Sequence, residues 1–340
     1  MIVRERVILS PYTSLSVGGP ARFFVEATSE QDVSDAVDFA AREHLPILPL
    51  GGGTNVLVPD AGVEAVVLSF GSGHFSCTPA HDTNTLLVAD AGVSWDALVD
   101  AAAAQDLWGI ENLAGIPGRA AGALVQNIGA YGVEFSSVFT YADVFDCGAR
   151  AVRHISRSDA HLAYRTSLFK EDHTLIILRI ALTLSGRGTP QLAYADLVRA
   201  QEAGVVLSTP RDIVKTVRSI RAAKFPQRPD STAGSFFKNP IVSGEQARAL
   251  QKRFPGLPVY PESSGRIKLS LAWLLDHALG LKGFTEGHVR LFEKQPIVLV
   301  ALPGATAREI DTFACSIERR VHDELSIRIE REVALFDAAS

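Results

Sequence analysis

Runs rich in valine, isoleucine and leucine alternate with amphipathic stretches through the first half of the chain. The apolar runs predict β-strands over residues 45–50, 64–70 and 84–93. Residues 29–44 have helical spacing instead, with Ser29 placed to cap the helix and Asp32 three residues later. A second helical pattern covers residues 93–107 and runs into glycine-rich sequence. This mixture of strands and helices indicates an α+β or α/β region that extends to about residue 187.

The pattern breaks at SGRGTP (185–190), which predicts a turn or loop. Beyond it, helical spacing predicts helices over residues 210–225, 244–254, 268–280 and 306–326. A strand is predicted at 295–302, and the chain closes on an extended segment, 327–336. Strict alternation of apolar and charged side chains from Ile327 to Glu332 favours a strand there.

The composition fits a globular protein of two domains or one large domain. Of the 340 residues, 47% are hydrophobic and 21% are charged, which is enough to bury a substantial core. The formal net charge of −5 argues against a nucleic-acid or membrane-surface partner, because such partners require a basic face. An anionic ligand would therefore be bound by local cations or backbone N–H groups.

Cysteine usage and the lengths of the apolar runs favour the cytoplasm. The apolar run 174–184 is shorter than the ~18–20 residues of a spanning helix and contains Arg179. The N-terminal segment MIVRERVILSPYTS lacks the apolar core of a signal peptide. The cysteines fit no metal-binding spacing, so we expect no metal site. We interpret Cys77, Cys147 and Cys315 as small hydrophobic residues that are buried, in a protein of a reducing compartment.

Three consecutive glycines lie in LPLGGGTNVLVPD (48–60), between two predicted strands and before Thr54 and Asn55. Glycines let a ligand approach the main chain, and successive N–H groups in such a loop can bind phosphate oxygens. The loop is neither a Walker A motif, since no Gly-Lys-Ser/Thr follows, nor a dinucleotide fingerprint, since no helix begins there. A tight hairpin explains the same residues equally well.

A second glycine-rich stretch, GIENLAGIPGRAAGALVQNIGAYGVEF (109–135), contains six glycines. The stretch is too flexible for a helix or a plain strand and too apolar for an exposed linker. A flat, largely apolar ring contacted by backbone amides and by Gln126 and Asn127 would account for it. Turn glycines in a domain without a ligand are the alternative.

Ser235, in GSFFKNP (234–240), has the Ser-x-x-Lys spacing of acylated serine enzymes. That chemistry needs a helix, and Pro240 disfavours helical backbone at Asn239. The partner motifs Ser-Asp-Asn and Lys-Thr-Gly do not occur in the chain, and the serine is not in Gly-x-Ser-x-Gly. A serine that only caps a loop remains the alternative.

Four motifs in this order resemble the UDP-N-acetylenolpyruvoylglucosamine reductase (MurB) family: GGGTNVLV, GIPGRAAGALVQNIGAYGVE, YRTSLFK and GSFFKNP. The resemblance covers nearly the whole chain. It implies an α+β fold with a two-part FAD-binding domain of the PCMH (vanillyl-alcohol-oxidase-like) type over 17–187. A smaller α/β substrate-binding domain would span 220–325, and a C-terminal strand, 326–336, would return to the active site.

The resemblance also implies the reaction and its partners. The family reduces UDP-N-acetylglucosamine enolpyruvate to UDP-N-acetylmuramate in peptidoglycan precursor synthesis, with non-covalent FAD as cofactor and NADPH as co-substrate. We expect a cytoplasmic enzyme, a monomer, with no nucleic-acid partner and no membrane insertion. The alternatives are an FAD-dependent alcohol oxidase of the same cofactor-binding fold and a non-catalytic flavin-binding module. GSFFKNP favours the reductase, because neither alternative needs a proton donor facing the flavin.

Three catalytic residues are implied by their match to family motifs. Ser235 would give a proton to the enolpyruvyl carbon, and Arg165 would hold the substrate carboxylate with its planar guanidinium. Glu332 would help to polarise or protonate the intermediate. Glu330 is less favoured, since the family's glutamate directly precedes valine. The family tail often reads EPEVRF, and this chain has EREVAL, with Ala334 where the family often has arginine.

The remaining site residues also rest on the resemblance. Tyr194 would belong to a substrate-covering loop that only one of the two family types has. The resemblance implies substrate contacts for Tyr164, Tyr194, Lys224, Asn239 and Gln295. It implies cofactor contacts for Gly51, Gly52, Gly53, Thr54, Asn55, Gly115, Ile116, Pro117, Gly118, Gln126, Asn127, Gly129, Ala130 and Gly132.

Overall fold

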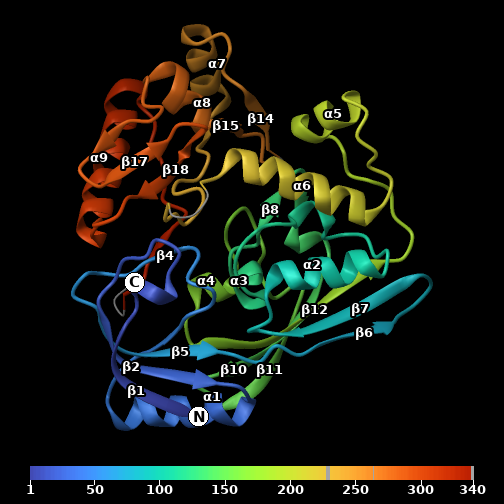
Figure 1. Cartoon of the computed structure of the whole chain (residues 1–340), viewed down its shortest axis with the longest axis vertical. Helices are drawn as coiled ribbons and strands as arrows, with labels where there is room; N and C mark the ends of the chain where they lie inside the picture. The colour runs from blue at the N-terminus through green and yellow to red at the C-terminus, as the bar shows by residue number, and fades with distance from the viewer. Residues whose placement is uncertain (227–229, 263, 338–340) are drawn as a thin grey trace. The chain divides into compact units, whose positions relative to one another are not determined.

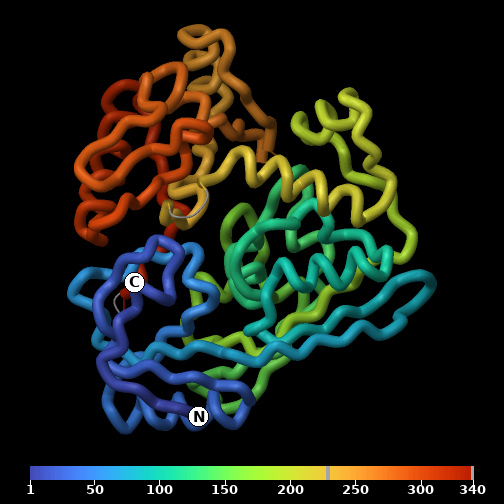
Figure 2. Tube along the Cα trace, in the orientation of Figure 1, coloured from blue at the N-terminus to red at the C-terminus, as the bar shows by residue number. Residues whose placement is uncertain are grey.

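The structure is a computed structural model that describes residues 1–226, 230–262 and 264–337. Contacts within the chain divide it into two compact units that interleave in sequence, as the colours along the trace in Figure 2 help to follow. Unit 1 contains residues 1–7, 21–53 and 64–223. Unit 2 contains residues 8–20, 54–63 and those from 224 onward. The domain ranges from the sequence are continuous, and they remain a prediction.

Unit 1 contains a four-stranded sheet in the order β1 (Ile2–Ile8), β2 (Pro20–Ala27), β5 (Val63–Phe70) and β3 (Ile47–Pro49). Helix α1 (Glu30–Arg42) packs its apolar face into a core with β2 and β5. The Ser29 side chain accepts a hydrogen bond from the Asp32 N–H, as the sequence predicted. The predicted helix 29–44 and the strands 45–50 and 64–70 are therefore confirmed within a few residues.

A five-stranded antiparallel sheet forms the rest of the framework of unit 1 (Figure 1). Its strand order is β11 (Ala151–Ser156), β10 (Phe139–Asp146), β12 (Leu175–Ser185), β7 (Asn84–Asp90) and β6 (Phe75–Pro79). Strand β12 is the apolar run of the sequence, and its side chains are largely buried while Arg179 is exposed. Helix α2 (Trp95–Ala104) buries Trp95 and Leu98 in the core with this sheet.

The glycine-rich stretch 109–135 contains more regular structure than the sequence suggested. It forms η2 (Glu111–Leu113), helix α3 (Ala120–Val125), the paired strands β8 (Gly129–Ala130) and β9 (Val133–Glu134), and the start of η3 (Phe135–Ser137). The expectation that it is too flexible for a helix is wrong for α3. Gly122 costs that helix about 1 kcal/mol relative to alanine, and the buried side chains of Ala120, Ala123 and Leu124 offset this.

Helix α4 (Leu168–Glu171) precedes β12, and unit 1 ends with α5 (Ala195–Glu202) and α6 (Pro210–Lys224), whose last residue belongs to unit 2. Residues 186–190 form the predicted loop between β12 and α5. Among the described residues, no helix combines the length and the apolar character needed to cross a bilayer.

The three cysteines are free thiols. They are half-buried, so the expectation that they are buried is wrong.

Unit 2 contains two three-stranded sheets and, in its described residues, two helices that begin with a capping box. One sheet has the order β16 (Thr285–Glu286), β17 (Val289–Phe292), β18 (Gln295–Ala301), and the other β13 (Ile241–Val242), β15 (Ile267–Leu269), β14 (Val259–Pro261). Capping boxes begin α7 (Gly244–Arg253) and α9 (Ala307–Leu325). Short elements complete the unit: η1 (Ser10–Tyr12), β4 (Val56–Leu57), α8 (Leu271–Trp273), the π-helix η4 (Leu274–Ala278) and β19 (Ala334–Leu335).

Two sequence predictions in unit 2 need correction. The helix predicted at 268–280 begins only at Leu271, because Ile267 to Leu269 pair as β15 and Ser270 caps the helix. In the C-terminal segment, Ile327 and Ile329 are buried and Arg328 and Glu330 exposed, as the alternation required. The regular ladder, however, is β19, which pairs in parallel with β4. Alternation records which side chains are buried, and an isolated extended segment satisfies it as well as a sheet strand does.

Candidate active site

The triple-glycine loop connects two different sheets. Before it, β3 pairs in parallel with β5, and after it, β4 pairs in parallel with β19. The hairpin alternative is therefore wrong. Gly53 has a φ of 63°, in the left-handed region that favours glycine. At Gly52, an added Cβ would lie 2.9 Å from the Cα of Gly118, so the two glycine motifs of the sequence are in direct contact.

Charged side chains hold the loop of Gly115 to Gly118 in place through hydrogen bonds to its main chain. The Gly115 N–H donates to the Asp96 carboxylate at 2.7 Å, and its carbonyl accepts from Arg221 Nε at 3.0 Å. Arg218 bridges Asp96 and Asp100 at 2.9 and 2.8 Å. Gly115 and Gly118 have φ values of 69° and 127°. This rigid glycine backbone is suited to close approach by a ligand.

Two polar residues of QNIGAYG hold the neighbouring chain. Asn127 is buried, and its amide donates to the Ala163 carbonyl at 2.9 Å and accepts from the Ser136 N–H at 3.0 Å. Gln126 Oε1 accepts from Lys170 Nζ at 3.1 Å. Both side chains were predicted to contact a cofactor. The structure gives Asn127 a structural task as well, because it fixes the turn that carries Arg165.

Arg165 lies in a tight turn closed by reciprocal backbone hydrogen bonds of 3.1 Å between Ala163 and Thr166. Tyr164 and Arg165 are the two central residues, and the Arg165 guanidinium carbon lies 5.9 Å from the Tyr164 ring centroid. Arg165 has a φ of 55°, which non-glycine residues rarely adopt and which is found preferentially at functional sites. Its Nη2 donates to the Gly129 carbonyl at 3.1 Å.

Tyr194 is the N-cap residue of α5 and is 46% exposed. Its ring meets the Tyr131 ring edge to face, with centroids 5.1 Å apart. Burial raises the pKa of Tyr131 to about 12, although the nearby Arg221 opposes this. Burial lowers the pKa of Arg221, and Tyr131 opposes that in turn. The Tyr194 ring therefore contacts Tyr131, which interacts in turn with Arg221, the residue that binds the Gly115 carbonyl.

Asn112 joins the same structures from within the core. It is fully buried, and its Nδ2 donates to the Tyr131 carbonyl at 2.8 Å and to the Gln191 carbonyl at 2.9 Å. Sequence reasoning missed it, although an asparagine inside the apolar part of 109–135 was a signal of a buried polar contact. It also missed Asp96, Arg218 and Arg221, whose spacings of three or four on two helices were the available signal.

In unit 2, Ser235 lies on extended backbone beside β18. It forms an isolated antiparallel β-bridge with Val298, and the Phe236 N–H donates to the Ile297 carbonyl at 2.9 Å. Phe236 and Phe237 are buried, with ring centroids 5.2 Å apart. The segment is not helical, so the Ser-x-x-Lys geometry of acylated serine enzymes is absent at these residues, all of which are described.

Glu332 is bonded to the same segment. Its N–H donates to the Phe236 carbonyl at 2.8 Å, and its carbonyl accepts from Asn55 Nδ2 at 3.0 Å. The structure thus brings together the Ser235–Phe236 segment, Glu332 and Asn55, which lies two residues after the triple glycine. The alternative glutamate, Glu330, is exposed and forms an ion pair with Lys238 at 3.0 Å.

The other predicted substrate residues lie at the ends of elements. The Asn239 Oδ1 accepts from the Leu271 N–H at 3.0 Å, at the start of α8. Gln295 begins β18, and Lys224 is the last residue of α6. Unit 1 therefore carries Arg165, Tyr164 and Tyr194, and unit 2 carries the other predicted catalytic and substrate residues.

The geometry fits a bound FAD in one specific respect. Because the two loops contact each other at Gly52 and Gly118 and have glycines with positive φ, their main chain is not covered by side chains. A ligand can therefore approach this main chain closely, which a larger side chain would prevent. A family model described as an FAD binding domain matches residues 21–154, which include both loops. The protein is therefore a flavoprotein of α+β fold with a PCMH-type FAD-binding domain.

Comparison with known proteins names the family. Residues 226–336 match a model described as the C-terminal domain of UDP-N-acetylenolpyruvoylglucosamine reductase. The enzyme of that name from Pseudomonas aeruginosa is 37% identical over 338 residues, which cover 98% of this chain and 99% of the relative. The enzyme of the same name from Shewanella sp. (strain ANA-3) is 35% identical over 328 residues, which cover 95% of this chain and 94% of the relative.

A solved structure supports the same assignment. The MurB crystal structure from Thermus caldophilus aligns with a TM-score of 0.69 and 26% identity, over 98% of this chain and 100% of that one. The chain belongs to the UDP-N-acetylenolpyruvoylglucosamine reductase family. It is an FAD-dependent oxidoreductase, and the predicted fold class and family are confirmed.

Proposed function

We propose that this protein reduces UDP-N-acetylglucosamine enolpyruvate to UDP-N-acetylmuramate with NADPH, a step of peptidoglycan precursor synthesis in the cytoplasm. The observation that carries the proposal is the end-to-end similarity to the Pseudomonas aeruginosa reductase, which includes both matched domains. The hydrogen bond from the Glu332 N–H to the carbonyl of Phe236, the residue after Ser235, also supports it, because it brings into one region the two segments that would carry the proton donor and the second polar group.

Backbone groups of the two glycine loops, Gly51 to Asn55 and Gly115 to Gly118, would hold the FAD without a covalent bond. Further contacts would come from Gln126, Asn127 and the segment Gly129 to Gly132. When bound, the FAD would supply the hydride chemistry of the reduction, with NADPH as the source of the hydride. The domain ranges 17–187 and 220–325 belong to the same proposal.

Arg165 holds the carboxylate of the enolpyruvyl group. A guanidinium presents parallel N–H donors that match a carboxylate, and its charge stabilises the negative charge that hydride addition leaves there. The left-handed turn at Arg165 supports this role, because the backbone is held in an unfavourable conformation by Asn127 and by the Ala163–Thr166 bonds.

Ser235 gives its hydroxyl proton to the carbon next to the carboxylate. A hydroxyl is a weak acid, but an enolate-like carbon is basic enough to take its proton when the two are well placed. Glu332 polarises this centre or helps to restore the proton. Lys224, Asn239, Gln295, Tyr164 and Tyr194 bind the rest of the UDP-sugar.

The test uses the purified holoenzyme with NADPH deuterated at the transferred position. We expect consumption of NADPH that depends on the enolpyruvyl substrate, and a product that carries one deuterium on its terminal carbon. Unlabelled NADPH in heavy water should instead place one deuterium on the adjacent carbon. A flavin-loaded protein that consumes NADPH at the same rate with and without the substrate contradicts the proposal.

A further inference from the structure

Arg331 directly precedes Glu332, and its guanidinium is bound to one face of helix α9. Its Nε lies 2.7 Å from Glu318 Oε1, and its Nη1 lies 2.5 Å from Asp311 Oδ1. Its Nη2 donates to the Cys315 Sγ at 3.0 Å. Each of the three guanidinium nitrogens therefore has a partner on the same helix.

The three partners, at positions 311, 315 and 318, are four and three residues apart and so lie on one face of the helix. The Arg331 guanidinium contacts all three of them. Helix α9 is a firm support for them. Its apolar face, from Ala307 to Leu325, is buried, and a capping box begins it. Burial alone would lower the pKa of Arg331, but Glu318 and Asp311 outweigh burial and raise it, so the guanidinium stays charged.

The main chain on either side of Arg331 is held separately. The Lys238 N–H donates to the Glu330 carbonyl, and the Glu332 N–H donates to the Phe236 carbonyl, both at 2.8 Å. Arg331 lies between these bonds, opposite Phe237. The chain bends at Glu332, so no regular ladder orients its side chain. With Arg331 fixed against α9, the backbone that carries the Glu332 side chain is fixed on its N-terminal side.

We propose that Arg331 is a positioning residue that holds the Glu332 carboxylate in its reactive orientation. The inference rests on the proposed role of Glu332. Arg331 itself touches neither the substrate nor the flavin in this scheme. Its task is to add a side-chain anchor to a segment whose main chain is held by hydrogen bonds at Glu330, Glu332 and Ala334.

The test measures the two half-reactions of the holoenzyme separately, by rapid mixing without oxygen. Arg331→Ala should slow reoxidation of the reduced flavin by the enolpyruvyl substrate by roughly ten- to a hundredfold, the cost of a misplaced group. Reduction of the flavin by NADPH should change less than about twofold. Glu318→Gln removes one charge of the clamp with almost no change in volume, and should give a smaller loss in the same half-reaction.

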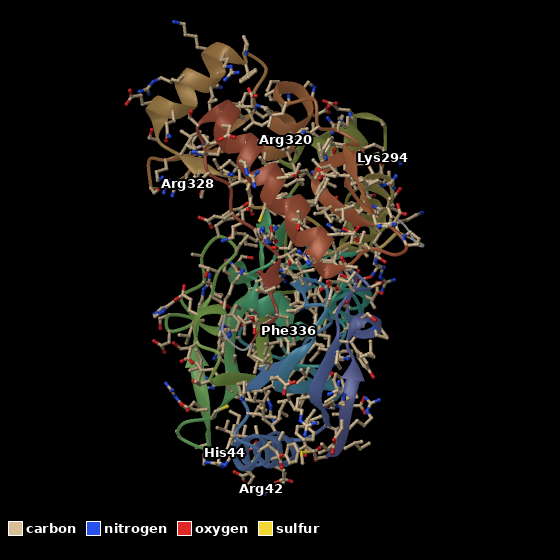
Figure 3. All side chains as sticks on the ribbon, turned by 90° about the vertical axis from the view of Figure 1, so that its left-hand side faces the viewer. Arg42, His44, Lys294, Arg320, Arg328 and Phe336 are labelled. Carbon is tan, nitrogen blue, oxygen red and sulfur yellow. The ribbon has the colours of Figure 1, made fainter. Side chains whose placement is uncertain are left out.

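Arg328→Ala is the matched control. Arg328 is an exposed arginine three residues earlier in the same segment and is labelled in Figure 3. It should leave both half-reactions unchanged. A double-mutant cycle with Glu332→Gln then separates positioning from general destabilisation. In the Glu332→Gln background, Arg331→Ala should cause little further loss, because the group that it positions is already gone.

Each result identifies which proposal fails. If Glu332→Gln does not slow reoxidation, the proposed role of Glu332 is wrong. If Glu332→Gln slows reoxidation but Arg331→Ala and Glu318→Gln do not, only the positioning inference is overturned. Losses from Arg331→Ala that multiply fully with those of Glu332→Gln, or that affect both half-reactions equally, also overturn it. Should Arg331→Ala fail to fold, Glu318→Gln alone decides the question in the same way.

Discussion

Replacement of Gly52 by alanine tests whether the two glycine loops act as one flavin cradle. The new Cβ would lie 2.9 Å from the Gly118 Cα, whereas carbon atoms in contact normally lie about 3.5–4.0 Å apart. The obstacle is backbone, which cannot rotate away as a side chain can. One of the loops must therefore move by roughly 0.6–1.1 Å to restore a normal contact.

Overpacking of this kind costs about 1–3 kcal/mol. If FAD binding requires the native spacing of the loops, the same energy appears as an FAD dissociation constant about 5- to 150-fold higher. Gly51→Ala is the matched control for the stability measurement alone, because a Cβ at that position has no protein atom of the described residues within 4 Å. Its unfolding free energy should stay within about 0.5 kcal/mol of the wild type.

FAD affinity is measured by titrating flavin-free protein and following the flavin fluorescence, and stability by urea unfolding. Wild-type FAD affinity in Gly52→Ala would refute the idea that this contact shapes the cofactor site. A loss of stability in Gly51→Ala as large as that in Gly52→Ala would refute the packing argument, because Gly52 faces another backbone segment and Gly51 does not.

The remaining predictions concern the reaction itself. Ser235→Ala should leave flavin reduction by NADPH nearly intact and slow reoxidation by the enolpyruvyl substrate at least ~10²–10⁴-fold; rapid mixing tests this, and equal slowing of both steps would make the serine structural. Arg165→Lys keeps the charge but loses the planar fork, so we expect a large loss of turnover with FAD still bound, and wild-type turnover would exclude the carboxylate clamp. Tyr194→Ala should weaken the UDP-sugar more than NADPH, as steady-state KM values will show, and unchanged substrate affinity would remove this tyrosine from the site. Asn112→Leu loses the anchors of the Gln191 and Tyr131 carbonyls, so it should reproduce the Tyr194→Ala effect on KM, and an unchanged KM would contradict that coupling.

The sequence predicted best those elements whose buried side chains and whose end signals both lie within one stretch of the chain. Helix α9 is an example, because its apolar face, its Thr306 cap and its length are all contained in one stretch of chain. The C-terminal segment is the opposite case. Its alternation was visible, but its partners at Phe236 and β4 lie about 100 and 280 residues away in sequence, and no local pattern records such pairings.

The candidate site divides in the same way. Motif positions such as Ser235 could be chosen from the sequence because the chemistry needs a particular side chain there. The residues that hold the motifs could not, since Asp96, Arg218 and Arg331 resemble ordinary surface charges until their partners are known. A charge on a helix face is usually solvated, and only tertiary structure shows which charges bind backbone or one another.

The three proposed catalytic residues share one structural property, which bears on how the site is kept in order. Arg165, Ser235 and Glu332 each lie outside the regular helices and strands: in a tight turn, at an isolated bridge, and in a bend directly after such a bridge, respectively. Irregular backbone lets a side chain point where a helix or strand would not, but it has no ladder to hold it. Individual backbone hydrogen bonds hold all three segments. At two of them a side-chain amide adds to these bonds: Asn127 binds the Ala163 carbonyl, two residues before Arg165, and Asn55 binds the Glu332 carbonyl. Replacing such an anchor should therefore impair the reaction more than the fold.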